Sequence, residues 1–417
     1  MSKNARLLIV LFLCLGLTAW LISHYLFDYE SAQLNLSAST TANSPSNSPS
    51  ITAAKIANAQ LSNAELAALA NPATTKEERQ RVLQKQLALA EFTLATYKAG
   101  TQYGTQTQPA TEHPDQLYPN QPVSSELALR KADGGFDANI KIRTSQSHVY
   151  IGGAESVVFN ITAVNAEGQN QGQPVPLLVS RAVAKGLSFN TNPNSTNTGS
   201  SQSNPQWTMN FTDDGTAGDA VAADQIYSAV LAPSQTGLSN FSGTIRVELA
   251  FQAGGSVGIT FFDVQYSPTV PLAWRGAARD NVDAGSLLFS IPAKVTMAGR
   301  YVISGRVDDA LGKPFAFLIH NEVLNEGEQD VKLLLYGKLI RDYKPKFPLY
   351  LRDVDGYVLK ETGDFARVQI PRLIGRQLTS KNYPLDVFTT QEASSEQRTR
   401  YINELEEDVR KAQDALR

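Results

Sequence analysis

The stretch FSGTIRVELAF at residues 241–251, with VGITFFDVQY at residues 257–266, decides the fold of this chain. Apolar and polar side chains alternate in both runs, and Gly254 and Gly255 lie between them. An alternation of period two places successive side chains on opposite faces of a strand. Each run therefore predicts a half-buried strand, and the paired glycines predict the turn that separates them.

The same pattern recurs on both sides of this pair. Six more alternating runs precede it, at residues 140–144, 148–151, 156–164, 177–183, 206–211 and 226–231. Strands at this spacing, separated by turn residues, are typical of a β-sandwich. We therefore predict a first sandwich over residues 137–268.

A second series of runs follows the boundary marked by Pro268 and Pro271. The runs are at residues 287–291, 300–307, 315–323, 330–336, 348–353 and 357–370. They predict a second, smaller sandwich over residues 269–392. Residues 101–136 are predicted to be connecting loops. The two strand series predict a mainly β fold of two sandwiches, with α-helices on either side.

Helical patterns lie on both sides of the predicted strands, in a helical region at residues 59–100 and in a C-terminal helix at residues 393–417. Thr75 and Glu78 form a capping box that opens the longer N-terminal helix, and Gly100 is expected to end it. Each helix carries one apolar stripe at alternating spacings of three and four. The candidate interface residues on these stripes are Leu83, Leu87, Leu94, Ile402, Leu405, Val409 and Leu416.

Three burials would satisfy these stripes: against each other, against the same helix of a second copy, or against the β-domains. Packing within one chain is favoured, with the β-domains as the default surface, because short amphipathic helices usually cover a core. Self-association through the same stripes stays open.

The N-terminus predicts export. Residues 7–22 are an unbroken apolar run behind Lys3 and Arg6, and residues 1–30 are long enough to hold a transmembrane helix. The basic start places the N-terminus inside and the bulk of the chain outside. A cleaved signal peptide is the alternative, but the small residues that a cleavage site needs are missing after the apolar run. Residues 31–58 read as a disordered linker.

Composition excludes some partners. The chain has 37 basic and 40 acidic residues, a net charge of −3, and no basic cluster in the exported part. Nucleic acid is therefore not expected to bind. The one cysteine, Cys14, lies in the apolar segment, so no disulfide stabilises the exported part.

The sequence DDGTAGDAVAADQIY at residues 213–227 is the most distinctive motif. Its carboxylates can accept hydrogen bonds from nearby backbone N–H groups and so form successive Asx turns, which is the favoured interpretation. The alternative is a Ca²⁺ site made by Asp213, Asp214, Asp219 and Asp224. No cofactor other than calcium is suggested by the sequence.

This motif resembles the D-D-G-x-x-G-D-x-x-x-x-D-G-x-Y turn of bacterial exported Ig-like modules. Together with TSQS at 144–147, GRYV at 299–302, GRVDDALGKPF at 305–315, LRDVDG at 351–356 and EQRTRY at 396–401, it makes the chain similar to the choice-of-anchor X family of bacterial envelope proteins. The resemblance covers roughly residues 60 to 415. It implies two Ig-like domains, attachment to a membrane and no established catalytic role. The chain departs from the pattern at Ala223 and Gln225, where glycine is usual, so we expect a less tightly turned loop.

Catalytic motifs are missing from the sequence. His113 lies between Glu112 and Asp115 and is the one constellation that a hydrolase could use, but the flanking prolines favour an ordered loop. Arg352, Asp353 and Asp355 read as solvated loop ends or guards of a strand edge.

The sequence therefore predicts a non-enzymatic binding or scaffolding module of the bacterial cell envelope. It would be anchored by a single pass in the inner membrane, with its bulk in the periplasm. Its partner would be an unknown envelope protein or a second copy of the chain. The alternative is a calcium- or saccharide-binding module that uses the loop at residues 213–224.

Overall fold

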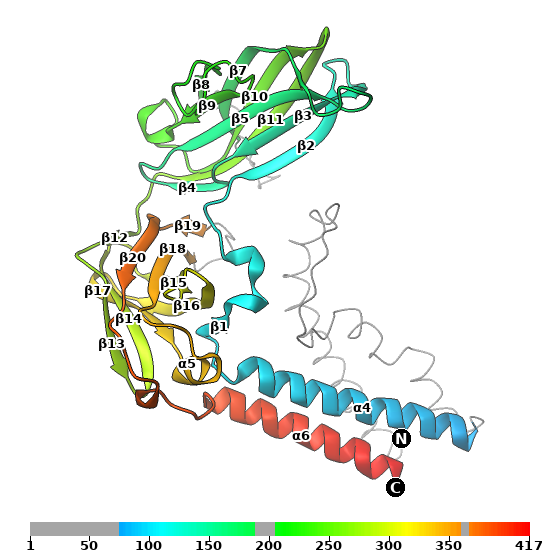
Figure 1. Cartoon of the computed structure of the whole chain (residues 1–417), viewed down its shortest axis with the longest axis vertical. Helices are drawn as coiled ribbons and strands as arrows, with labels where there is room; N and C mark the ends of the chain where they lie inside the picture. The colour runs from blue at the N-terminus through cyan, green and yellow to red at the C-terminus, as the bar shows by residue number, and fades with distance from the viewer. Residues whose placement is uncertain (1–74, 188–204, 360–366) are drawn as a thin grey trace, which may run out of the picture. The chain divides into compact units, whose positions relative to one another are not determined.

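The computed structural model describes residues 75–187, 205–359 and 367–417. The transmembrane segment predicted at residues 1–30, the linker at 31–58 and the helical residues 59–74 lie outside the described residues. In the part that the structure describes, no helix combines the length and the apolar character needed to cross a membrane. The described chain is mainly β, as predicted (Figure 1).

The first pair of sheets, called sandwich 1, has five strands in each sheet. One sheet has the order β2-β3-β5-β6, with β9 also paired to β5. Its strands are β2 (Val123–Arg130), β3 (Phe136–Gln146), β5 (Val157–Asn165), β6 (Pro174–Val175) and β9 (Tyr227–Leu231). The other sheet has the order β4-β11-β10-β7-β8. Its strands are β4 (Tyr150–Gly152), β7 (Leu177–Leu187), β8 (Gln206–Thr208), β10 (Gly243–Ala253) and β11 (Ser256–Ser267).

The alternation in residues 241–266 buries one face of the β10–β11 hairpin. Ile245, Val247 and Leu249 of β10 are in the core, while the residues between them face outward. Phe262 of β11 meets Phe159 of β5 from the opposite sheet, with ring centroids 4.8 Å apart. The predicted period of two is therefore confirmed, and a continuous apolar core lies between the two sheets.

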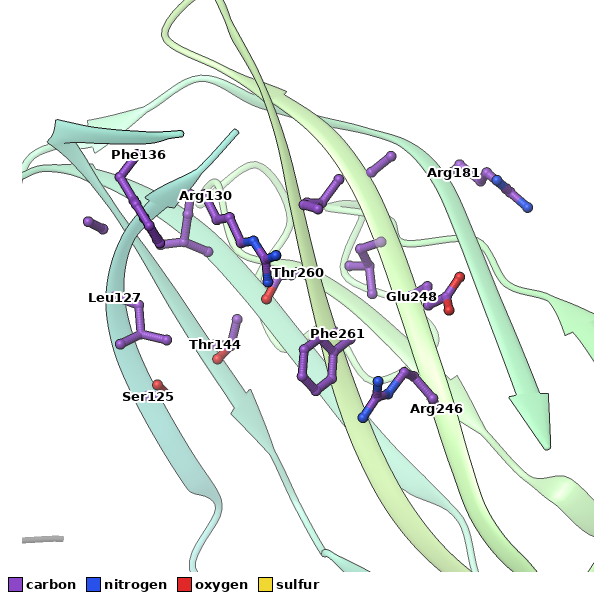
Figure 2. Close-up of a pocket in the computed structure, with 15 residues that line it drawn as sticks. Ser125, Leu127, Arg130, Phe136, Thr144, Arg181, Arg246, Glu248, Thr260 and Phe261 are labelled. Atoms are coloured by element: carbon purple, nitrogen blue, oxygen red, sulfur yellow. The ribbon is translucent and has the colours of Figure 1, made fainter. Parts of the chain in front are cut away.

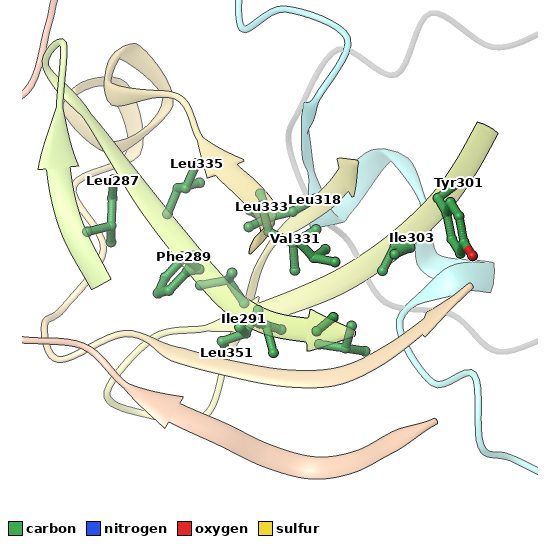
Figure 3. Packing of buried hydrophobic residues seen from close by; sticks show 14 of the residues in the cluster. Leu287, Phe289, Ile291, Tyr301, Ile303, Leu318, Val331, Leu333, Leu335 and Leu351 are labelled. Atoms are coloured by element: carbon green, nitrogen blue, oxygen red, sulfur yellow. The ribbon is translucent and has the colours of Figure 1, made fainter. Parts of the chain in front are cut away.

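The second pair of sheets, called sandwich 2, has six strands facing four. The larger sheet holds β1 (Thr107–Pro109), β15 (Gly299–Asp308), β16 (Pro314–Leu324), β18 (Tyr350–Leu359), β19 (Arg367–Gln369) and β20 (Leu373–Thr379). The smaller sheet holds β12 (Leu272–Trp274), β13 (Arg279–Asp283), β14 (Ser286–Val295) and β17 (Gly327–Leu335). Figure 3 shows Phe289 and Ile291 of β14 in the core between them.

The described chain also contains one short helix and four 3₁₀ turns. Helix α5 (Gly337–Tyr343) follows β17 and buries Leu339 and Ile340. Single 3₁₀ turns occur as η1 (Ala110–Glu112), η2 (Pro114–Gln116), η3 (Pro233–Gln235) and η4 (Leu385–Val387).

The prediction that residues 101–136 are connecting loops is wrong in part, because they contain β1 and β2. Strand β1 pairs with β16, so sandwich 2 begins before sandwich 1, and the strands of sandwich 1 are inserted between β1 and β12. Strand β1 is three residues long, too short to show a period. Strand β2 has one buried residue, Leu129, so it lacks the alternation of a half-buried strand.

Smaller corrections concern the end of sandwich 2. The run predicted at residues 348–353 and the start of the run predicted at 357–370 form the single strand β18, and β20 and α5 were not predicted. The polar residues in the middle of β18 hid its continuity, because Asp353 has a positive φ of 46° and lies where the pairing with β20 is irregular.

Helices α4 (Lys76–Thr101) and α6 (Glu396–Leu416) pack side by side and antiparallel (Figure 1). Their N-caps follow the sequence: Thr75 Oγ1 accepts from the Glu78 N–H at 3.2 Å, and Ser395 Oγ accepts from the Arg398 N–H at 3.0 Å. Helix α4 continues one residue past Gly100, which therefore does not end it. Of the three burials left open by the sequence, the structure shows the two helices packed on each other.

Candidate binding sites

The loop between Asp213 and Ile226 is held by its own carboxylates. Asp213 accepts from the Asp224 N–H at 3.1 Å and, through its other oxygen, from the Gln225 N–H at 2.9 Å. Asp219 accepts from the Gly215 N–H at 2.6 Å. Asp224 accepts from the Ile226 N–H at 2.9 Å. The bond of Asp224, to the N–H two residues on, is an Asx turn as the motif predicts. Asp213 and Asp219 accept from N–H groups farther away in the chain, and the bonds of Asp213 tie the two ends of the loop together.

Three of the four carboxylates predicted as metal ligands also lie together. Asp213, Asp219 and Asp224 each offer an oxygen, and these oxygens lie within 4.8 Å of one another. Asp214 is not in this group. Its carboxylate accepts from the N–H and hydroxyl of Thr216 and from the hydroxyl of Thr212. Carboxylate oxygens at this spacing fit a hard cation such as Ca²⁺.

The backbone of this loop is left-handed at residues that are not glycine. Ala223 has φ 62° and Gln225 has φ 66°, at the two positions where the resembling motif has glycine. The loop thus keeps the tight turn that glycine would favour, with a side chain at each position. A non-glycine residue in this conformation costs about 1 kcal/mol or more.

The two helices meet through polar contacts as well as through the stripes. Lys98 Nζ lies 2.8 Å from Glu406 Oε1, and the rings of Tyr97 and Tyr401 have centroids 5.7 Å apart. The predicted interface residues Leu83, Leu87, Leu94, Ile402, Leu405, Val409 and Leu416 are all half-buried. They form part of a contact within the chain, and each keeps some exposed surface.

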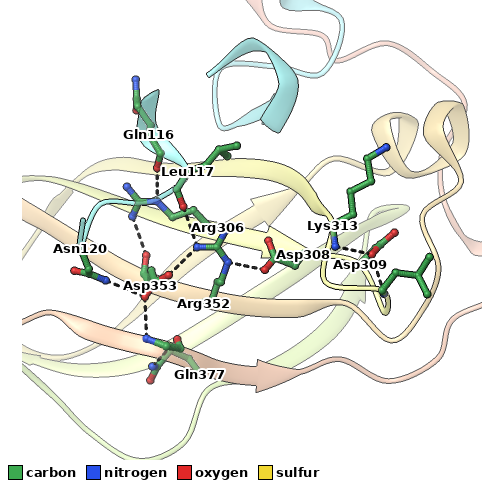
Figure 4. A network of polar contacts seen from close by, with 12 residues as sticks. Gln116, Leu117, Asn120, Arg306, Asp308, Asp309, Lys313, Arg352, Asp353 and Gln377 are labelled. Carbon is green, nitrogen blue, oxygen red and sulfur yellow. Dashed lines mark hydrogen bonds and ion pairs between the residues drawn. The ribbon is translucent and has the colours of Figure 1, made fainter. Parts of the chain in front are cut away.

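A buried network in sandwich 2 explains the polar cluster at residues 352–355 (Figure 4). Arg306, 4% exposed, donates to the carbonyls of Gln116 and Asp353, each at 2.8 Å. Arg352 lies 2.6 Å from Asp308 and donates to the carbonyl of Leu117 at 2.9 Å. The cluster is therefore structural: it fastens the segment after β1 to the larger sheet, and is not the solvated loop end that the sequence suggests.

The histidines also have structural surroundings. The ring of His113 packs against Phe317, with centroids 6.0 Å apart, between the turns η1 and η2. His320 is buried in β16, and its Nδ1 lies 3.2 Å from the carbonyl oxygen of Lys332. Burial lowers the pKa of His320, and burial likewise lowers the pKa of His148.

A groove that the sequence did not predict runs along one side of sandwich 1. Strand β2 ends its sheet and pairs with β3 alone, and β11 pairs with β4 only at its last three residues. The two strand edges are joined at one end by the isolated bridge between Lys131 and Gly258. Away from this bridge they are not paired, and a cavity of about 740 Å³ lies there.

The groove has an apolar floor that continues the core. Figure 2 shows Leu127 on one side and Phe261 on the other. Leu127 is directly opposite Ile142, a core residue, and so faces the interior side of the sheet, yet it is 68% exposed. A large apolar side chain at a core-facing position with no cover marks a place where the sandwich is left open.

Charged side chains line the rest of the groove, at the end of β2 and on the outer face of the other sheet. The polar lining includes three arginines and one glutamate, namely Arg130, Arg181, Arg246 and Glu248. Arg246 is paired with Asp263, and Glu248 with Lys185. In the described ranges, Arg130 and Arg181 form no ion pair and remain available to an acidic group.

Comparisons with known proteins give little beyond this geometry. No family model matches the chain, and no curated protein matches it. Among solved structures it is similar to a DUF4785 family protein from Legionella pneumophila, with 10% identity, a TM-score of 0.36 and coverage of 57% of each chain. It is also similar to the Yersinia pseudotuberculosis adhesin InvE, with 13% identity, a TM-score of 0.17 and coverage of 54% of this chain and 56% of that chain. The chain thus spans just over half the length of each of these two proteins.

Proposed function

We propose that this protein is a non-enzymatic binding or scaffolding module of the bacterial cell envelope. In this proposal the segment at residues 1–30 anchors it in the inner membrane, and two Ig-like sandwiches lie in the periplasm. The resemblance to the choice-of-anchor X family supports the same assignment. The polar clusters of the described chain favour binding over catalysis, because their charged groups hold loops and strands in place.

The open groove of sandwich 1 is the observation that carries this proposal. A sandwich normally covers its interior side chains on both sheets, but Leu127 faces the interior side and remains 68% exposed. A cavity of about 740 Å³ with an apolar floor and a few polar groups is typical of a binding site.

Crosslinking of the full-length protein in its native membrane, followed by affinity capture and mass spectrometry, tests the proposal. We expect one reproducible envelope protein as the partner. A variant truncated after Glu392 removes α6 and exposes the face of α4 that α6 covers. Loss of the partner on truncation would place the contact on the helices, whereas its retention would place it on the sandwiches. Recovery of the protein alone, or crosslinked only to itself, would contradict a scaffolding role.

The second candidate function is calcium or saccharide binding by the loop at residues 213–224. It rests on the three carboxylates whose oxygens lie within 4.8 Å of one another. If the loop binds calcium, millimolar CaCl₂ raises the melting temperature, EDTA reverses the effect, and Asp224→Asn abolishes it. Calcium-dependent retention on an envelope glycan would extend the function to saccharides. A melting temperature that is the same in calcium and in EDTA would remove this candidate.

A further inference from the structure

The groove of sandwich 1 has the geometry of a site for an added strand. Strand β2 is eight residues long and has a partner on one edge only. At about 3.3 Å per residue, its free edge spans roughly 26 Å, which suits a segment of six to eight residues. Unpaired backbone N–H and C=O groups along such an edge bind an extended peptide by continuing the sheet.

Several other edge strands of sandwich 1 do not offer an unpaired edge of this length. Strands β4, β6 and β8 are two or three residues long, so each exposes few backbone groups. Strand β2 contains neither proline nor lysine, and its charged residues are Arg130 and Glu126, the latter paired with Lys141 and Arg143. An eight-residue edge without proline or lysine, next to uncovered apolar side chains, suits the recognition of another chain.

The side chains of the groove define the sequence that would bind. The floor is apolar, at Leu127, Ile142 and Leu249, and an added strand would present every second side chain to it. Arg130 lies at the end of β2, and Arg181 lies on β7, opposite Ala250 on the outer face of the other sheet; no carboxylate of the described chain is paired with either. An acidic residue of the peptide would form an ion pair with one of these arginines.

We propose that the groove between β2 and β11 binds an extended, acidic segment of another envelope protein with apolar residues at alternate positions, and that this segment adds to β2 as a strand. This inference rests on the proposed function and names the chemistry of its partner. The charge of Arg130 and Arg181 decides among occupants, since a second copy of the groove would bring arginine against arginine.

A displayed library of random nonapeptides, selected on the full-length protein in mild detergent, tests this proposal. We expect enriched sequences with apolar residues at every second position and at least one Asp or Glu. A synthetic peptide of the enriched sequence should bind about tenfold more weakly, or worse, to Leu127→Asp. The double variant Arg130→Gln with Arg181→Gln should keep the apolar alternation and lose the preference for acidic residues.

The control is Val323→Asp, which introduces the same charge at a side chain 67% exposed on β16 of sandwich 2. It should bind the peptide as the unaltered protein does. Equal melting temperatures of the three forms would show that Leu127→Asp keeps the fold, as expected for an exposed side chain.

Several results would overturn the proposal. They are enrichment no greater on the unaltered protein than on Leu127→Asp, enriched peptides without alternation, and enriched peptides that are basic. A dimer that Leu127→Asp dissociates would identify a second copy as the occupant instead. If peptide selection fails but the cellular partner is still captured from Leu127→Asp, the groove assignment is wrong and the scaffolding role stands.

Discussion

The hydrogen bonds of Asp213 make a quantitative prediction about the loop after β8. Its two carboxylate oxygens accept from the Asp224 and Gln225 N–H groups at 3.1 and 2.9 Å. Hydrogen bonds to a charged group contribute roughly 1.5–3 kcal/mol each. Because Asp213 is half-buried, the lower end applies, and Asp213→Ala should lower the free energy of unfolding of sandwich 1 by about 3 kcal/mol.

Asp213→Asn tests the two hydrogen bonds of Asp213 with a smaller change. The amide keeps one acceptor oxygen and loses the charge, so about half of this loss, roughly 1.5 kcal/mol, is expected. At about 3 °C per kcal/mol for a domain of this size, Asp213→Ala should melt roughly 9 °C lower. Calorimetry follows the melting transition, and EDTA in the buffer removes any contribution of a metal.

Glu167→Ala is the matched control, because Glu167 is an exposed carboxylate of the same sandwich that makes no hydrogen bond in the described part of the chain. It should change the melting temperature by less than about 2 °C. A loss below about 1 kcal/mol for Asp213→Ala, or a loss equal to that of the control, would refute the structural role of these bonds.

Three further predictions concern other residues. Gln225→Gly should stabilise sandwich 1 by about 0.5–1 kcal/mol in urea unfolding, because φ at residue 225 is 66° and glycine adopts this conformation without strain. Arg306→Met should destabilise sandwich 2 by about 3–5 kcal/mol in urea unfolding, because it leaves Asp355 and two half-buried carbonyl groups, those of Gln116 and Asp353, without their partner. Burial lowers the pKa of His320 in the folded chain. The neutral form of His320 therefore contributes fully to the stability of the fold above pH 6.5, the ordinary pKa of histidine, and this contribution is lost as the pH falls from 6.5 through the folded pKa. His320→Gln should reduce the loss of stability between pH 7.5 and 5.5.

Each of these has a result that would contradict it. A neutral or destabilising effect of Gln225→Gly on the free energy of unfolding would contradict the first prediction. A free energy of unfolding of Arg306→Met within about 1 kcal/mol of that of the unaltered protein would contradict the second. The same slope of stability against pH in the unaltered protein and in His320→Gln, with Arg300→Gln as an exposed control on the neighbouring strand, would show that His320 does not titrate on unfolding.

How far the sequence predicts this fold depends on how strongly each strand is buried. Strands β5, β10 and β11 face a core on one side, so their apolar residues alternate and the strands can be predicted. The stripes of α4 and α6 are predictable for the same reason, since Ile402 and Leu405 recur at helical spacing. The choice of partner for each stripe depends on where the chain brings the two helices, which local periodicity does not contain.

The candidate sites divide in the same way. The Asx turn at Asp224 is local, because it joins this side chain to the N–H two residues on, and the motif predicts it. Asp213 instead accepts from N–H groups 11 and 12 residues on, across the loop. The groove is long-range: it needs β2 and β11 to lie side by side and to separate beyond Lys131. Strand β2 is exposed at all but one position, so no burial pattern marks it in the sequence.

Site-specific photocrosslinking in cells tests strand addition at the groove most directly. A photoreactive phenylalanine derivative replaces Leu127 in the full-length protein, and a second form carries it at Val323. We predict that residue 127 crosslinks to one segment of another envelope protein, and that peptide mapping finds apolar residues at alternate positions of that segment with an acidic residue among them. Crosslinking at residue 127 no stronger than at residue 323, or only to the protein's own chain, would contradict it.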